Sequence, residues 1–145
     1  MKRRLAMLAA GMALLAAACG SSKGSGSSVA TRTVDVDMQT LAFAPNAYEA
    51  KVGETVAFRF KNTSRVVHEA VFGDQAFQDQ HEMDMTSGNA AGAGMHHGDT
   101  TEVVTLEAGK TGTVSHTFDK AGTFLIACHQ PGHYAGGMKA TVVVT

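Results

Sequence analysis

The chain has 145 residues, which is enough for one domain of ordinary size and too few for two comfortable ones. Its formal charge is −1 and 17% of its residues are charged, which excludes both a disordered polyelectrolyte and a polybasic nucleic-acid binder. Two cysteines are too few for a disulfide scaffold. The chain also has eight methionines and seven histidines, and this number of soft ligand atoms needs an explanation.

Residues 1–18 have the organisation of a signal peptide. Lys2, Arg3 and Arg4 precede an apolar run, and Ala16-Ala17-Ala18 offers a small-residue cleavage site. The apolar run covers about fourteen residues, whereas a membrane-spanning helix needs roughly twenty. We therefore expect an exported protein, without a permanent membrane span in this segment.

Cys19 follows the small residues directly, and a Gly/Ser-rich stretch follows Cys19. This arrangement resembles the lipobox of bacterial lipoproteins, which implies that Cys19 is lipidated and that residues 19–30 tether the domain to the outer face of the cytoplasmic membrane. The alternative is simple cleavage after Ala18 and release into the periplasm or cell envelope.

Residues 31–145 are expected to form one all-β domain, because their apolar residues alternate with a period of two. Val34, Val36 and Met38 show this alternation, and so do Val56, Phe58 and Phe60. Met38 is expected in the core. Further strands are expected at residues 102–106, 112–118, 123–128 and 139–144, and Pro45 and Pro131 fall in expected connections. Many short strands at this spacing favour an antiparallel Greek-key β-sandwich.

Residues 73–100 break the strand pattern and are expected to form an insertion. Its first part, 74–85, predicts a short helix capped by Asp74, and its second part is rich in Gly and Ala, as loops are.

Metal-binding side chains concentrate after the strand predicted at residues 123–128. Cys128, His133 and Met138 follow one another at intervals of five residues and can converge from one loop. A thiolate, an imidazole and a thioether form a soft donor set, and His68, placed between a turn and an apolar stretch, is the candidate fourth ligand. Such a set favours copper. Zinc is a lesser alternative, because thioether binds zinc poorly and structural zinc sites use more thiolates.

These residues make the chain resemble the cupredoxins, the blue copper proteins that include plastocyanin, azurin and rusticyanin. The resemblance rests on the following residues: Phe43-x-Pro45, Gly53, Val56-x-Phe58-x-Phe60-x-Asn62, His68, Phe118-x3-Gly122-x-Phe124 and Cys128-x4-His133-x4-Met138. It implies one type-1 copper centre with His68, Cys128 and His133 in a plane and Met138 as the axial ligand.

The resemblance further implies a monomeric electron carrier, not an enzyme. Its partners would be redox proteins of the cytochrome or oxidase type, with no nucleic acid bound. His133 would be the electron port, surrounded by a patch that includes Gly132, Tyr134, Ala135 and Gly136.

Two neighbours of the ligands depart from the common family pattern. Glu69 stands where Asn or Ser usually follows the first His ligand, and His129 stands where Ser or Thr usually follows the Cys. We interpret His129 as an exposed side chain on the opposite face of its strand. The alternative is a second electron route.

A second function is suggested by the soft side chains of the insertion. They form a candidate second copper site: His81, Met83, Met85, Met95, His96 and His97. Such groups suit copper capture, so a copper chaperone or copper-resistance protein is the alternative function. They could instead belong to a flexible lid with packed methionines and solvated histidines. A non-metal structural β-domain is the third hypothesis.

Overall fold

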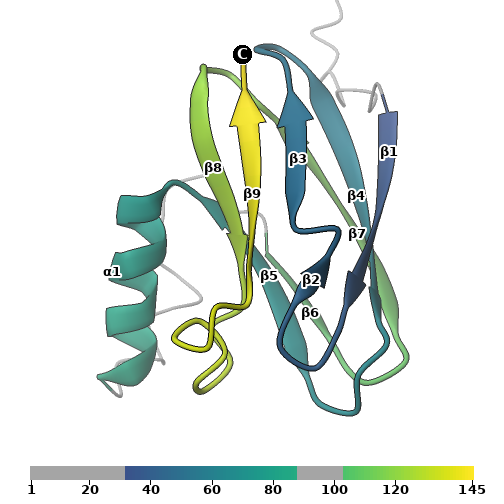
Figure 1. Cartoon of the computed structure of the whole chain (residues 1–145), viewed down its shortest axis with the longest axis vertical. Helices are drawn as coiled ribbons and strands as arrows, with labels where there is room; N and C mark the ends of the chain where they lie inside the picture. Colours follow the sequence, from purple (N-terminus) through teal and green to yellow (C-terminus); the bar gives the residue numbers. More distant parts are fainter. Residues whose placement is uncertain (1–31, 88–102) are drawn as a thin grey trace, which may run out of the picture.

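The computed structural model describes residues 32–87 and 103–145, and Figure 1 shows their arrangement. Nine strands and one helix occupy these two ranges. In chain order they are β1 (Arg32–Met38), β2 (Phe43–Ala44), β3 (Ala47–Ala50), β4 (Thr55–Asn62), β5 (His68–Gly73), α1 (Gln75–Thr86), β6 (Val103–Leu106), β7 (Thr111–Thr117), β8 (Gly122–Ala127) and β9 (Lys139–Val144). The predicted signal peptide, Cys19 and the predicted tether lie outside the described residues.

The strands form two sheets that pack face to face. One sheet has the order β2-β1-β4-β7 and the other has the order β3-β9-β8-β5-β6. The predicted β-sandwich is therefore confirmed. Most neighbouring strands are antiparallel, but β1 pairs in parallel with β4, and β3 pairs in parallel with β9.

The core lies between the sheets and is built by the alternating residues that the sequence singles out. Val36 and Met38 of β1 are buried, as predicted, and they join aromatic residues from β4 and β5. Phe58 of β4 lies at the centre of this aromatic group. Its ring centroid is 5.2 Å from that of Phe72 in the opposite sheet. Burial of such side chains contributes about 25 cal/mol per Å² of apolar surface.

Two short strands were not predicted. Pro45 was placed in a connection, yet β2 ends and β3 begins on either side of it. Both strands lie at sheet edges, where the missing N–H of a proline is tolerated. The partner of β3 is β9, about a hundred residues further along the chain. Local sequence patterns do not reveal a pairing of this kind.

The helix begins almost where it was predicted. The Asp74 side chain accepts a hydrogen bond from the backbone N–H of Phe77 at 2.9 Å, which makes it the N-cap of α1. Figure 1 shows α1 beside the sheet formed by β8 and β5. In the described ranges, no helix has the length and apolar character needed to cross a membrane.

Two connections leave the sandwich at the same end. The β4–β5 connection and the longer β8–β9 connection both lie at the lower end of Figure 1. The β8–β9 connection carries three of the four predicted copper ligands, and the β4–β5 connection leads into His68, the first residue of β5. The fold thus brings together residues that are far apart in sequence.

Candidate metal centre

The β8–β9 connection, residues 128–138, is held in shape by its own backbone. The Cys128 N–H donates to the Met138 carbonyl at 3.1 Å, and the Met138 N–H donates to the His133 carbonyl at 2.9 Å. Gly132 and Gly137 have φ angles of +81° and +90°, which a side chain at Cβ would disfavour. The three ligand candidates of this connection are therefore presented by a tightly wound loop.

The other connection presents His68, which is the first residue of β5. Asn62, at the end of β4, is fully buried, and its side-chain amide donates to the carbonyls of Val66 and Leu106 at 2.7 and 2.9 Å. Its Oδ1 accepts from Ser64 N–H at 3.0 Å. The Asn62 side chain thus shapes the turn that leads to His68.

His68, Cys128 and His133 converge on one point. Their ligand atoms all lie within 4.8 Å of one another. The Cys128 Sγ lies 3.7 Å from His68 Nδ1 and 3.3 Å from His133 Nδ1, so both rings present the same nitrogen to the sulfur. Met138 is fully buried and is tied to Cys128 and His133 by the backbone bonds described above. Two imidazoles and a thiolate, with a thioether alongside, fit copper.

Comparison with known proteins identifies the family. The model of the family described as "Copper binding proteins, plastocyanin/azurin family" matches residues 30–145. The chain is a cupredoxin. This result confirms the resemblance, the fold class and copper as the cofactor that were predicted from the ligand spacing.

Individual relatives of this cupredoxin include two curated proteins named copper-resistant cuproprotein CopI. The protein from Pseudomonas aeruginosa is 32% identical over 139 residues, covering 79% of this chain and 77% of its own. The protein from Rubrivivax gelatinosus is 40% identical over 116 residues, covering 79% and 67%. A solved structure of auracyanin B matches with a TM-score of 0.68 and 27% identity, covering 81% of this chain and 91% of that one.

The electrostatics of the cupredoxin site favour neutral ligands before metal binds. Burial lowers the pKa of His68, and the neighbouring His133 adds to this, while the backbone of Gln39 opposes it. Burial raises the pKa of the Cys128 thiol, although backbone N–H groups of Glu69 and Gln130 favour its thiolate. In the metal-free protein at neutral pH, His68 is therefore an unprotonated imidazole and Cys128 is a protonated thiol.

Copper binding should consequently release a proton from Cys128. At pH 8 in a weakly buffered solution with a pH indicator, we expect about one proton released per copper bound, because the metal-bound thiolate must be deprotonated. His68 contributes none, since its pKa is lowered. The same titration of Cys128→Ser should release no proton of this kind, and equal release from both proteins would contradict the assignment.

Glu69 joins the two ligand-bearing connections. Its carboxylate accepts a hydrogen bond from His129 N–H at 2.9 Å, and its own N–H donates to Cys128 Sγ at 3.5 Å. Burial raises the pKa of Glu69, and the hydrogen bond from His129 opposes this rise. Glu69 thus replaces the usual Asn or Ser, but its side chain still links the two loops that carry the ligands.

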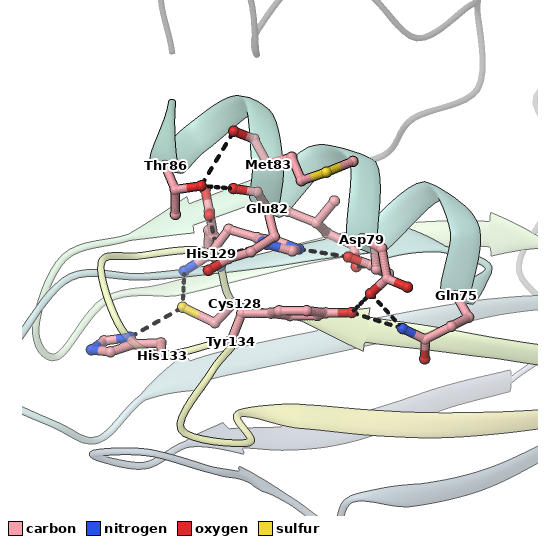
Figure 2. A network of polar contacts seen from close by, with 12 residues as sticks. Gln75, Asp79, Glu82, Met83, Thr86, Cys128, His129, His133 and Tyr134 are labelled. Atoms are coloured by element: carbon pink, nitrogen blue, oxygen red, sulfur yellow. Dashed lines mark hydrogen bonds and ion pairs between the residues drawn. The ribbon is translucent and has the colours of Figure 1, made fainter. Parts of the chain in front are cut away.

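The interpretation of His129 as an exposed side chain is wrong. Only 2% of its surface is accessible, because α1 covers it. Its Nδ1 lies 2.7 Å from Glu82 Oε2 (Figure 2). Its Nε2 lies 2.7 Å from Gln78 Oε1. Burial lowers the pKa of His129, and Glu82 opposes this. The predicted helix conceals the ring, and sequence alternation alone did not reveal that contact.

The predicted patch around His133 also needs one correction. Gly132, Ala135 and Gly136 are exposed and His133 is half-buried, but Tyr134 is only 7% exposed. The Tyr134 hydroxyl donates to Asp79 of α1 at 2.8 Å (Figure 2). Burial is the main cause that raises the pKa of Tyr134 to about 12, and the hydrogen bond to Asp79 adds to this rise. Tyr134 therefore fixes the loop to the helix and does not belong to the surface.

Leu41 is a surface residue beside the loop that sequence reasoning missed. It is 45% exposed, and a Cβ added at Gly136 would come within 3.0 Å of its side chain. Its position between β1 and β2 gives no local signal of this contact. Leu41 adds apolar surface on the same side as Gly136.

The candidate second copper site is only partly within the described residues. His81 is buried, with its ring centroid 4.6 Å from that of His129, whereas Met83 is 56% exposed and Met85 is half-buried. The described members therefore differ in burial, and the second site stays a prediction. Met95, His96 and His97 lie outside the described residues.

Proposed function

We propose that this cupredoxin carries single electrons through one type-1 copper centre formed by His68, Cys128, His133 and Met138. The observation that supports this most strongly is the convergence of two imidazole Nδ1 atoms on one buried thiol, within 4.8 Å. When bound, copper supplies a one-electron couple between Cu(II) and Cu(I).

The ligand residues favour a carrier because the protein holds them in place. His68, Cys128 and Met138 are buried, and backbone hydrogen bonds fix the loop that carries three of the four donors. Ligands that cannot rearrange keep a similar geometry in both oxidation states, which lowers the barrier to electron transfer. Four protein donors also leave no evident position for a substrate, so we propose a carrier and not an enzyme.

His133 is the proposed electron port, since it is the one half-buried ligand among buried ones. Leu41, Ala135 and Gly136 provide exposed small or apolar surface near it, as a brief redox encounter requires. We propose a redox protein as the partner and a monomer as the working form. The leader-like residues 1–18 and Cys19 support export and lipid anchoring in the cell envelope.

Voltammetry of the copper-loaded protein, together with NMR measurement of electron self-exchange, tests the carrier function. We expect a reversible one-electron couple, and slower self-exchange in Leu41→Asp without a change in potential. Val143→Asp is the matched control, because Val143 is equally exposed but lies on β9. An irreversible couple, or equal slowing by both variants, would count against the proposal.

Copper resistance is the second candidate function, and the names of the two CopI relatives favour it. Metal analysis separates the two functions. A carrier binds one copper per chain, whereas a copper-handling protein binds additional Cu(I). Replacing Met95, His96 and His97 with Ser should remove that additional copper and leave the type-1 spectrum intact. A single copper in both proteins would leave the carrier as the supported function.

A further inference from the structure

Gln78 of α1 is a fully buried polar residue that is not itself a candidate copper ligand. Its side chain lies where the helix packs against β5 and β8, the two strands that lead to or from copper ligands. The Gln78 Nε2 donates to the Val71 carbonyl of β5 at 2.8 Å and to the Leu125 carbonyl of β8 at 3.4 Å. A buried amide with these contacts is anchored to both strands.

These two bonds determine which way the amide points. Because Nε2 faces two carbonyl oxygens, Oε1 must face the opposite side, where His129 Nε2 lies 2.7 Å away. A carbonyl oxygen only accepts hydrogen bonds, so His129 Nε2 is the donor in this contact. Gln78 therefore fixes one edge of the His129 ring.

The remaining sides of the ring are also occupied. Glu82 Oε2 lies 2.7 Å from Nδ1, and Tyr134 stacks on one face with a centroid distance of 4.5 Å and an interplanar angle of 20°. His81 contacts the ring edge-to-face, with centroids 4.6 Å apart. Figure 2 shows Glu82, His129 and Tyr134 between α1 and the chain segment that carries Cys128.

We propose that Gln78, supported by Glu82, is a positioning residue of the copper site that acts through the His129 ring. His129 follows Cys128 directly in the chain, and its backbone N–H donates to Glu69. When the His129 ring is held in place, the backbone of Cys128, and with it the direction of the Cys128 side chain, is held as well. A thiolate held in one orientation sets both the strength and the geometry of its bond to copper. The helix thus holds the thiolate in position through its contacts with His129. This role concerns copper binding and is independent of electron transfer.

Gln78→Met tests the proposal, because it keeps the side chain's length and removes its hydrogen bonds. We expect Gln78→Met to weaken binding of the one copper by up to about 10-fold, the lower end of the cost of losing a direct partner of a metal ligand, because Gln78 acts one residue further from the metal. The ratio of its thiolate-to-copper absorption bands should also change. In the metal-free protein, the amide protons of Cys128 and His129 should exchange faster. Gln80→Met is the matched control, because Gln80 is exposed and its side-chain amide donates to Asp84 of the same helix.

A double-mutant cycle with His129→Phe separates positioning from simple packing. If Gln78 acts through the ring nitrogen, Gln78→Met should change the copper spectrum much less in the His129→Phe background. Glu82→Gln is the milder variant should Gln78→Met fail to fold, since the Glu82 side chain is 21% exposed; it should shift the band ratio in the same direction. An unchanged copper spectrum in a folded Gln78→Met or Glu82→Gln protein would overturn the proposal, even if the melting temperature fell.

Discussion

Cys128→Ser should abolish the intense visible absorption of the copper-loaded protein. That absorption arises from charge transfer between a thiolate and copper, and Cys128 is the one cysteine among the described residues. A serine hydroxyl is a harder donor that remains protonated at neutral pH. Loss of a partner of a ligand costs about 10–100-fold in affinity, so loss of the thiolate ligand itself should weaken Cu(II) binding by at least about 100-fold.

The measurement is a titration of the metal-free protein with Cu(II), followed by visible spectroscopy and competition with a chelator. Cys19→Ser is the matched control, because it makes the same substitution at the chain's other cysteine. It should leave the band unchanged. A band of full intensity in Cys128→Ser would exclude Cys128 as the ligand.

Among the substitutions proposed, Phe58→Ala should lower the free energy of unfolding most. The Phe58 ring is 1% exposed and contacts four aromatic rings, with the nearest centroids, those of Phe72 and Tyr48, at 5.2 and 5.6 Å. Truncation of a buried phenylalanine costs about 3–5 kcal/mol, through lost burial and the cavity that remains. Single domains are stable by only about 5–15 kcal/mol, so much of the folding free energy would be lost.

Urea unfolding of the metal-free protein measures this loss. The midpoint should fall strongly with little change in the slope, because the surface exposed on unfolding stays nearly the same. Val143→Ala is the control: Val143 is 44% exposed, and the cost of such a surface change is about 0.5 kcal/mol or less. A midpoint in Phe58→Ala close to that of Val143→Ala would show that Phe58 is not central to the core.

The sequence predicted the strands whose side chains alternate clearly between core and solvent. β9 was predicted at its observed bounds, and β8 and β7 within one residue at each end. The short strands β2 and β3 were missed, because they surround a proline and depend on partners elsewhere in the chain. Their pairing is decided by tertiary contacts rather than by local preference.

The convergence of the candidate metal ligands was predictable for a different reason. Cys128, His133 and Met138 lie in one loop, so their spacing alone indicates convergence, and the position of His68 between a turn and an apolar stretch made it the candidate fourth ligand. The surroundings of the site were less predictable. The buried residues of α1 are Gln78 and His81, which are polar, so the helix lacks an apolar face that could have revealed its packing. Gln78 of this helix contacts Leu125 of β8, which is 47 residues further along the chain.

The parallel pairing of β3 with β9 has a consequence for the order in which the protein is assembled. His68 and Cys128 are sixty residues apart, and β9 completes the loop that joins the thiol to Met138. Contacts over such separations form late in folding, since the chain must first close long loops. A chain still emerging amino end first therefore presents His68 well before the thiol and Met138 that complete the donor set. We therefore expect the complete donor set to form only when β9 has joined its sheet, so that copper binds to the folded sandwich.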